Sequence, residues 1–318
     1  MATVMSTNEG PVFIVGAPRS GTTLLQYMLR AHPRISLPTG ESHYFIPLLG
    51  SAADFGDLHT LEAKTAVLAA MYRQSAEFLD TDLHGMRFDI DGLARQFQAE
   101  ARDTMESLLA GVLERNARGE GKSRWGDKTP YYVLHMERLK TAFPDAQFIH
   151  LIRDGRDVAL SLFGRRDDFH VYNVYCAAKY WQRYVDEGRR QGGRIGTSAY
   201  FELRYEDLIR EPKTALQAIC RFLGEEFLDE LLNYKRAGQE GKTPLVSQPL
   251  QPQNREKWRS EFSRWQLFVF DSVAGDTLRA CGYAPATGAT KPLPLPLRAA
   301  FRLHDHVVGK LRHHTAQS

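Results

Sequence analysis

Two segments of this sequence carry residues that can bind anions. The first, GAPRSGTTLL at residues 16–25, follows the apolar run VFIV and spaces two glycines as G-x-x-x-x-G. Between a strand and a helix, such a loop directs backbone N–H groups toward an anion at the helix N-terminus. Its side chains add a cation and three hydroxyl groups. The candidate anion-binding residues are Arg19, Ser20, Gly21, Thr22 and Thr23.

This loop lacks the lysine of a nucleoside-triphosphate site. A Walker-type loop continues as Gly-Lys-Ser/Thr, where the lysine reaches the terminal phosphates and the hydroxyl group binds Mg²⁺. Here Gly21 is followed by two threonines, and the basic residue, Arg19, lies inside the loop. The pattern therefore predicts a nucleotide without a γ-phosphate and without a metal ion. A tight turn that uses glycine only for its conformation is the alternative.

The second segment, FIHLIRDGRDVALSLF at residues 148–163, places Arg153 at the end of a strand-like run and Ser161 eight residues later. Eight residues are about two helical turns. Ligands of open α/β sheets lie at the carboxyl ends of the strands, so both segments are expected to face one crevice and share one ligand. We interpret Asp154, Arg156 and Asp157 as capping and pairing residues at the helix start.

The elements that position these segments alternate between strands and helices. Apolar runs predict strands at 12–15, 35–37, 146–154 and 198–208, and helical patterns follow them. This order predicts an α/β fold with a P-loop-type, mostly parallel sheet flanked by helices. Residues 58–118 read as helices, which indicates a helical insertion at about 55–120.

The remaining sequence is expected to form a single domain over residues 1–290 and a tail over 291–318. The segment 244–262 is polar and rich in proline, as is typical of a long loop. The tail is Pro-rich and then basic, with an apolar stripe. It is compatible with weak contact to an anionic membrane surface, although we favour a docked or frayed tail.

Composition excludes several classes of function. The 318 residues carry a net charge of only +3, which does not indicate a nucleic-acid-binding protein. The three cysteines are too widely spaced for a disulfide framework or a zinc cluster. With no signal peptide and no run of 18 apolar residues, we expect a cytoplasmic protein without a transmembrane segment. Nothing in the sequence indicates an oligomeric state.

Together, GAPRSGTTLL and IRDGRDVALSL resemble the paired nucleotide-binding motifs of sulfotransferases that use 3′-phosphoadenosine-5′-phosphosulfate (PAPS). The resemblance extends from about Val12 to Trp258. It implies that the glycine loop binds the 5′-phosphosulfate, and that Arg153 and Ser161 bind the 3′-phosphate. The segment YEDL is similar to the family segment that places an aromatic ring, here Tyr205, beside the adenine.

The segment LPTGESHYFIP at residues 37–47 resembles the branches of this family that act on protein tyrosines and on glycosaminoglycans, where a glutamate is the base. That resemblance implies Glu41 as the general base and His43 as the alternative. An ordinary carboxylate is a weak base, so we expect burial to raise the pKa of Glu41.

Two further segments carry basic residues of interest. WGDKTP resembles a family element whose lysine approaches the reacting group, which implies that Lys128 neutralises charge on the leaving phosphate. NREKWRSEF at residues 254–262 lies where family members close the 3′-phosphate site with a basic loop, so Arg255 and Lys257 are candidates.

The sequence thus predicts a PAPS-dependent sulfotransferase, a transferase of sulfur-containing groups. Its acceptor would be a hydroxyl group of a saccharide, a peptide tyrosine, a lipid or a metabolite. Two alternatives stay open: a small-molecule kinase with a degenerate Walker loop, and a nucleotide-binding module without catalysis.

Overall fold

The computed structural model of this chain describes residues 9–79, 88–233, 250–289 and 291–316. A five-stranded sheet of order β2-β3-β1-β4-β5 lies at its centre, and every neighbouring pair of strands is parallel. The strands are β1 (Val12–Gly16), β2 (Ile35–Ser36), β3 (Arg124–Lys128), β4 (Gln147–Ile152) and β5 (Tyr200–Arg204). The predicted α/β class with a mostly parallel sheet is confirmed.

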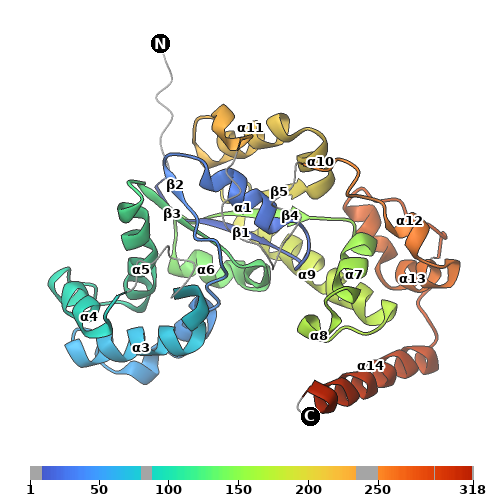
Figure 1. Ribbon diagram of the computed structural model, residues 1–318, viewed down its shortest axis with the longest axis horizontal. Helices are drawn as coiled ribbons and strands as arrows, with labels where there is room; N and C mark the ends of the chain where they lie inside the picture. Colours follow the sequence, from blue (N-terminus) through green and yellow to red (C-terminus); the bar gives the residue numbers. More distant parts are fainter. Residues whose placement is uncertain (1–8, 80–87, 234–249, 290, 317–318) are drawn as a thin grey trace.

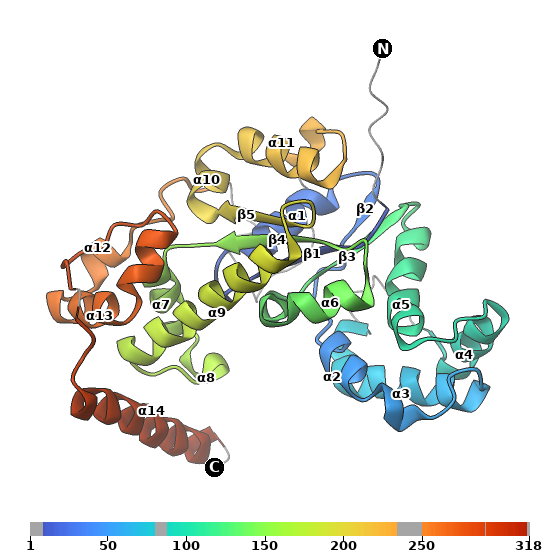
Figure 2. The same ribbon diagram turned by 180° about the vertical axis from the view of Figure 1, so that it is seen from behind.

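Both faces of the sheet are covered by helices (Figures 1 and 2). Successive strand residues point to opposite faces, so Phe13 and Val15 of β1 join one apolar core, whereas Val12 and Ile14 join the other. The first core includes residues of α6 (Met136–Ala142), α7 (Gly155–Phe163) and α9 (Val174–Ile195). The second includes residues of α1 (Thr22–Arg30), α10 (Tyr205–Arg210) and α11 (Pro212–Leu223). The continuous apolar runs that predicted buried strands follow from this double cover.

Strand β3 was not predicted, because its sequence RWGDK carries three charged residues. All five residues are buried. Buried charges are tolerated when they are paired and hydrogen-bonded, and Arg124 meets this condition. Its guanidinium donates to the Gly10 carbonyl at 2.6 Å, to Gln147 Oε1 at 2.6 Å and to Glu225 Oε1 at 3.3 Å. Apolar periodicity cannot predict such a strand.

Between β2 and β3, the described residues are mainly helical, and these helices lie beyond that edge of the sheet (Figure 1). They are α2 (Phe45–Gly50), the 3-10 helix η1 (Ala52–Phe55), α3 (Leu61–Glu77), α4 (Ile90–Ala99) and α5 (Met105–Gly119). The fully buried Lys64 of α3 ties this group together, since its Nζ donates to Asp103 Oδ1 at 2.8 Å and to Gln98 Oε1 at 3.0 Å.

The other helices follow β3 in the chain. They are η3 (Pro130–His135), α8 (Arg166–Phe169), η4 (Asp229–Leu231), α12 (Trp258–Glu261), α13 (Arg264–Ala280) and α14 (Leu295–Ala316). Part of the predicted loop at 244–262 lies outside the described residues. Helix α14 forms the edge of the molecule (Figure 1). No helix among the described residues is long and apolar enough to cross a membrane.

Candidate active site

A cavity of about 550 Å³ lies where the two anion-binding segments meet. The glycine loop reaches it from the end of β1, and Arg153 reaches it from the end of β4. The sequence therefore correctly predicted that both segments face one crevice. The predicted residues in the cavity wall are Arg19, Gly21, Thr22, Thr23, Glu41, His43, Arg153, Ser161 and Tyr205.

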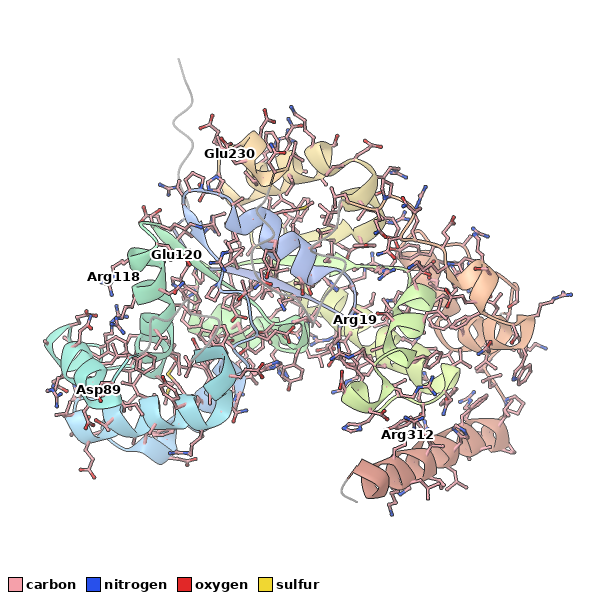
Figure 3. All side chains as sticks on the ribbon, viewed as in Figure 1. Arg19, Asp89, Arg118, Glu120, Glu230 and Arg312 are labelled. Atoms are coloured by element: carbon pink, nitrogen blue, oxygen red, sulfur yellow. The ribbon has the colours of Figure 1, made fainter. Side chains whose placement is uncertain are left out.

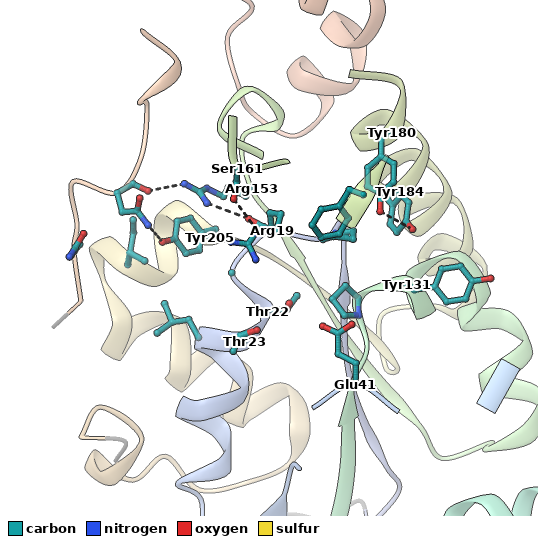
Figure 4. Close-up of a pocket in the computed structure, with 18 of the residues that line it drawn as sticks. Arg19, Thr22, Thr23, Glu41, Tyr131, Arg153, Ser161, Tyr180, Tyr184 and Tyr205 are labelled. Carbon is teal, nitrogen blue, oxygen red and sulfur yellow. Dashed lines mark hydrogen bonds between the residues drawn. The ribbon is translucent and has the colours of Figure 1, made fainter. Parts of the chain in front are cut away.

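Figure 4 shows two groups of side chains around this cavity. We call the first group the anion side and the second the aromatic side. The anion side consists of Arg19, Thr22, Thr23, Arg153, Ser161 and Tyr205. The aromatic side consists of Glu41, Tyr131, Tyr180 and Tyr184.

The glycine loop has a backbone that few residue types can adopt. Gly21 has φ +92°, and Arg19 has φ +71° although it carries a side chain. A Cβ atom at position 21 would lie 2.4 Å from Cδ2 of Tyr205. Glycine is therefore required both by the turn and by the close approach of the Tyr205 ring. A strained residue such as Arg19 in a cavity wall is typical of a functional site.

Direct contacts join the two halves of the anion side. Arg19 Nε donates to Ser161 Oγ at 2.9 Å, and Arg153 Nη1 donates to the Arg19 carbonyl at 3.3 Å. The Arg153 guanidinium lies 4.7 Å from the centre of the Tyr205 ring. Its Nε is buried and has no hydrogen-bond partner among the described residues. Arg153 therefore faces the cavity with hydrogen-bonding capacity left for an anion.

The loop before α12 closes the anion side. Asp157 accepts hydrogen bonds from the backbone N–H groups of Glu256 at 2.7 Å and Trp258 at 3.1 Å. Our interpretation of Asp157 as a capping residue of its own helix was therefore incomplete, whereas Asp154 does accept from the Arg156 N–H at 2.9 Å. In this position Asp157 fixes a distant loop over the cavity.

Asn254 in that loop lines the cavity and was missed by sequence reasoning. Its Nδ2 donates to the Tyr205 hydroxyl at 2.9 Å, and its carbonyl accepts from Arg153 Nη2 at 3.2 Å. Basic residues are the sequence signal of a phosphate-binding loop, and an uncharged amide does not give that signal. Arg255 and Lys257, the residues predicted there, are partly buried and exposed, respectively, and neither lines the cavity.

The position of Ser20 also differs from the other loop residues. It is fully buried and is not part of the cavity wall, and its hydroxyl has no hydrogen-bond partner among the described residues. Across the described part of the chain, no group of three or more His, Cys, Asp or Glu side chains could hold a metal ion.

Glu41 forms an ion pair with Lys128, the last residue of β3. Lys128 Nζ donates to Glu41 Oε1 at 2.7 Å, and the ring of His43 lies 3.1 Å from Glu41 Oε2. The Lys128 side chain is 4% exposed, whereas that of Glu41 is 37% exposed and faces the cavity. The structure thus places the predicted base and the predicted leaving-group cation in contact.

The pKa of Glu41 is shifted in the direction opposite to our expectation. Burial does raise the pKa of this carboxyl, but the charge and hydrogen bonds of Lys128 and His43 outweigh burial and lower the pKa to about 2. The expectation of a raised pKa was wrong because the sequence does not show how close Lys128 lies. In this state Glu41 is an ionised partner of Lys128 and a poor proton acceptor.

The aromatic side was not predicted from the sequence. Tyr180 and Tyr184 lie on consecutive turns of α9, with ring centres 4.7 Å apart, and the Tyr180 hydroxyl donates to that of Tyr184 at 3.2 Å. Tyr131 follows Lys128 closely in sequence, and Phe169 adds a fourth ring to the wall. A spacing of four residues places side chains on one helix face, so the two tyrosines of α9 carried a weak signal.

Comparisons with known proteins agree with this geometry. Residues 11–230 match the family model described as "Sulfotransferase family". Protein-tyrosine sulfotransferase 2 of Gallus gallus is 26% identical over 278 residues, which cover 84% of this chain and 65% of that protein. Protein-tyrosine sulfotransferase 1 of Danio rerio is 25% identical, over 92% of this chain and 78% of that protein. The chain thus spans about two thirds of the length of the first of these relatives.

Solved structures show the same fold. The sulfotransferase domain of the curacin biosynthetic pathway superimposes with a TM-score of 0.59 at 19% identity, covering 87% of this chain and 99% of that domain. The sulfotransferase domain of the olefin synthase of Synechococcus PCC 7002 superimposes with a TM-score of 0.55 at 24% identity, covering 83% of this chain and 94% of that domain. Since the family model spans more than half of the sequence, this chain belongs to the sulfotransferase family.

Proposed function

We propose that this protein transfers the sulfuryl group of PAPS to an acceptor hydroxyl group. One observation carries the proposal: a single cavity joins two separate anion-binding segments on its anion side to Glu41 on its aromatic side, and the buried Lys128 contacts Glu41 from behind the cavity wall. A donor with an anion at each end of its ribose needs two such segments. A ligand with a single anionic group would need only one anion-binding segment.

The residues of the anion side fit this donor. Arg19, Thr22 and Thr23, with the backbone N–H groups at the start of α1, would hold the 5′-phosphosulfate. Arg153 and Ser161 would hold the 3′-phosphate, and the unsatisfied Nε of Arg153 offers a hydrogen bond for it. The ring of Tyr205 would lie against the adenine. Bound here, the donor supplies an electrophilic sulfur and a phosphate leaving group.

Glu41 and Lys128 would act as a coupled pair. Lys128 Nζ lies 2.7 Å from Glu41 Oε1, so an anion bound beside Glu41 would give this ammonium a second partner. As Lys128 turns to that anion, the pKa of Glu41 rises because its main pairing interaction weakens. Glu41 then accepts the proton of the attacking hydroxyl, while Arg19 and Lys128 stabilise the charge that develops on the leaving phosphate.

The aromatic side indicates the kind of acceptor. Tyr131, Tyr180 and Tyr184 line the cavity on the same side as Glu41. Aromatic walls of this kind favour a flat aromatic ring, which they bind by stacking or edge-to-face contact. Among saccharide, peptide, lipid and metabolite hydroxyls, we therefore favour an aromatic hydroxyl. Relatives named protein-tyrosine sulfotransferase make a peptide tyrosine the first acceptor to test.

Thermal unfolding with two nucleotides tests the donor assignment. A ligand that binds the native state raises its stability by mass action. Adenosine 3′,5′-bisphosphate should raise Tm by several degrees at about 100 times its Kd, and ATP with Mg²⁺ should not. The reverse order would support the kinase alternative and refute the proposal. A cytoplasmic location and the division of the chain at residue 290 stay predictions from the sequence.

A further inference from the structure

Helix α14 exposes a row of large apolar side chains. Leu303, Val307 and Leu311 are 64%, 45% and 63% exposed, and their spacing of four residues places them in one stripe along the helix. Leu295, at the start of the same helix, is 76% exposed. Four of the seven large hydrophobic side chains that are exposed in the described part of the chain thus belong to this one helix.

The opposite face of α14 is fixed to the body of the protein. The ring of Phe301 stacks on Tyr175 of α9 with centres 5.5 Å apart and an interplanar angle of 8°. Asp305 Oδ1 accepts from the backbone N–H of Tyr172 at 2.8 Å. These contacts set the rotation of the helix, so the stripe faces outward because of the fold and not because the helix is loosely attached.

A third contact secures the C-terminal half of α14. Arg312 Nη1 pairs with Asp167 of α8 at 2.9 Å, and Figure 3 shows this arginine between α14 and the neighbouring part of the protein. Helix α14 is therefore anchored along its length, at residues 301, 305 and 312.

Positive charge borders the apolar stripe. Arg302 and Lys310 are exposed and also line a shallow hollow between α14 and Tyr172. At about 100° per residue, Lys310 lies about 20° from Leu303 and flanks the stripe, whereas Arg302 lies about 100° from Leu303, on the side of the hollow. Asp305 is the only acidic residue of α14, and it is turned inward to Tyr172. An outward apolar stripe with a cationic border and no opposing acidic side chain is the pattern of a helix that lies in a membrane interface.

We propose that this face of α14 binds the surface of an anionic membrane, with the helix parallel to the bilayer plane. Leu303, Val307 and Leu311 would enter the headgroup boundary, while Lys310 at the edge of the stripe pairs with anionic lipid headgroups and the exposed Arg302 adds longer-range attraction. A second copy of the chain fits this face less well. Antiparallel two-fold pairing through the stripe would bring the Lys310 side chains of both copies to the same flank. The proposal does not depend on the donor assignment.

Vesicle co-sedimentation of the full chain tests the proposal. Vesicles of phosphatidylcholine with about 30% phosphatidylserine should retain the protein at low salt, and raising NaCl to about 0.5 M should release most of it because salt screens the headgroup charges. The double variant L303Q/V307Q should bind about tenfold more weakly. The control L61Q, which removes an exposed leucine of α3, should bind like the wild type.

A second variant separates the apolar contribution to membrane binding from the electrostatic one and guards against misfolding. R302Q/K310Q leaves the apolar stripe intact and should lose only the salt-dependent part of the binding. Circular dichroism melting checks that each variant is folded. Equal binding to pure phosphatidylcholine vesicles, or an equal loss in L61Q and L303Q/V307Q, would overturn the proposal. A concentration-dependent dimer that L303Q/V307Q abolishes would overturn it too, since the face would then join two copies.

Discussion

The two sides of the cavity are built in different ways. Every residue of the anion side belongs to the glycine loop, to the segment that follows β4 or to the segment that follows β5. The aromatic side gathers single side chains from the chain after β2, from η3 and from α9. The anion side is therefore positioned by the ends of the sheet strands, whereas the aromatic side can change through single substitutions. Binding of the donor and choice of the acceptor should respond separately to mutation.

The largest expected effect lies on the aromatic side. Glu41→Gln should lower kcat by about 10³, because loss of a general base costs about 10² to 10⁴. The Kd of adenosine 3′,5′-bisphosphate should change less than about threefold, since binding of the donor belongs to the other side. Initial rates and calorimetric titration measure the two quantities.

His43→Asn is the matched control for this change, because His43 is the alternative base and lies 3.1 Å from Glu41. It should lower kcat by less than about tenfold, as expected for a group that only orients the carboxylate. A larger loss of kcat in His43→Asn than in Glu41→Gln would show that His43 is the general base.

The next effect concerns the anion side. Asp157→Asn removes a carboxylate that holds two backbone N–H groups of the loop before α12. Hydrogen bonds to a charged group contribute about 1.5–3 kcal/mol, so the Kd of the bisphosphate should rise about 10- to 100-fold, while the KM of the acceptor stays unchanged. Equal losses for both substrates would show that the two sides are not independent.

A smaller effect is expected from the tyrosines of α9. Tyr180→Ala should raise the KM of an aromatic acceptor about two- to tenfold, because an aromatic pair contributes about 0.5–1.5 kcal/mol. Tyr180→Phe, which keeps the ring, should preserve most of the affinity. Bisphosphate binding should not change in either variant. If Tyr180→Ala raises the KM of aromatic and aliphatic acceptors alike, the ring does not select the acceptor.

The smallest effect is the pH dependence of stability at Glu41. Its folded pKa of about 2 lies below the unfolded value of about 4.3. The pair with Lys128 therefore stabilises the fold above about pH 4.3, and this contribution is lost as pH falls toward 2. Because Glu41 is more than one third exposed, it amounts to about 1 kcal/mol or less.

Chemical denaturation of the wild type and of Glu41→Gln between about pH 3 and pH 6 measures this difference. The wild type should be the more stable of the two at pH 6, and the gap should narrow below about pH 4.3. A gap that widens as the solution becomes more acidic would show that the folded pKa is raised instead.

The contrast between the two sides also explains what the sequence could predict. The glycine loop and the segment around Arg153 are short, and each combines a strand, a turn and a helix start within a few residues. Local patterns were therefore sufficient for four of the five strands and for most of the anion side. Strand β3 was not predicted because its charged residues are buried, and Arg124 pairs with groups that are distant in sequence, such as Gln147 and Glu225.

The aromatic side was not predicted from the sequence for a related reason. Tyr131 and Tyr180 are 49 residues apart in sequence, and only the packing of α9 beside η3 brings them to one cavity. The pKa of Glu41 likewise depends on a distance of 2.7 Å to a residue 87 positions away. Distances between residues that are far apart in sequence determine the strength of charge interactions, and a local sequence pattern does not predict them.

The most direct test of the account combines one ligand change with one substitution. Calorimetry should compare adenosine 3′,5′-bisphosphate with adenosine 5′-monophosphate on the wild type and on Arg153→Ala, after a melt confirms that the variant is folded. If Arg153 binds the 3′-phosphate, removal of that phosphate should weaken binding about 100-fold in the wild type and less than about fivefold in the variant. Equal losses in both proteins would contradict the assignment of two anion sites to one donor.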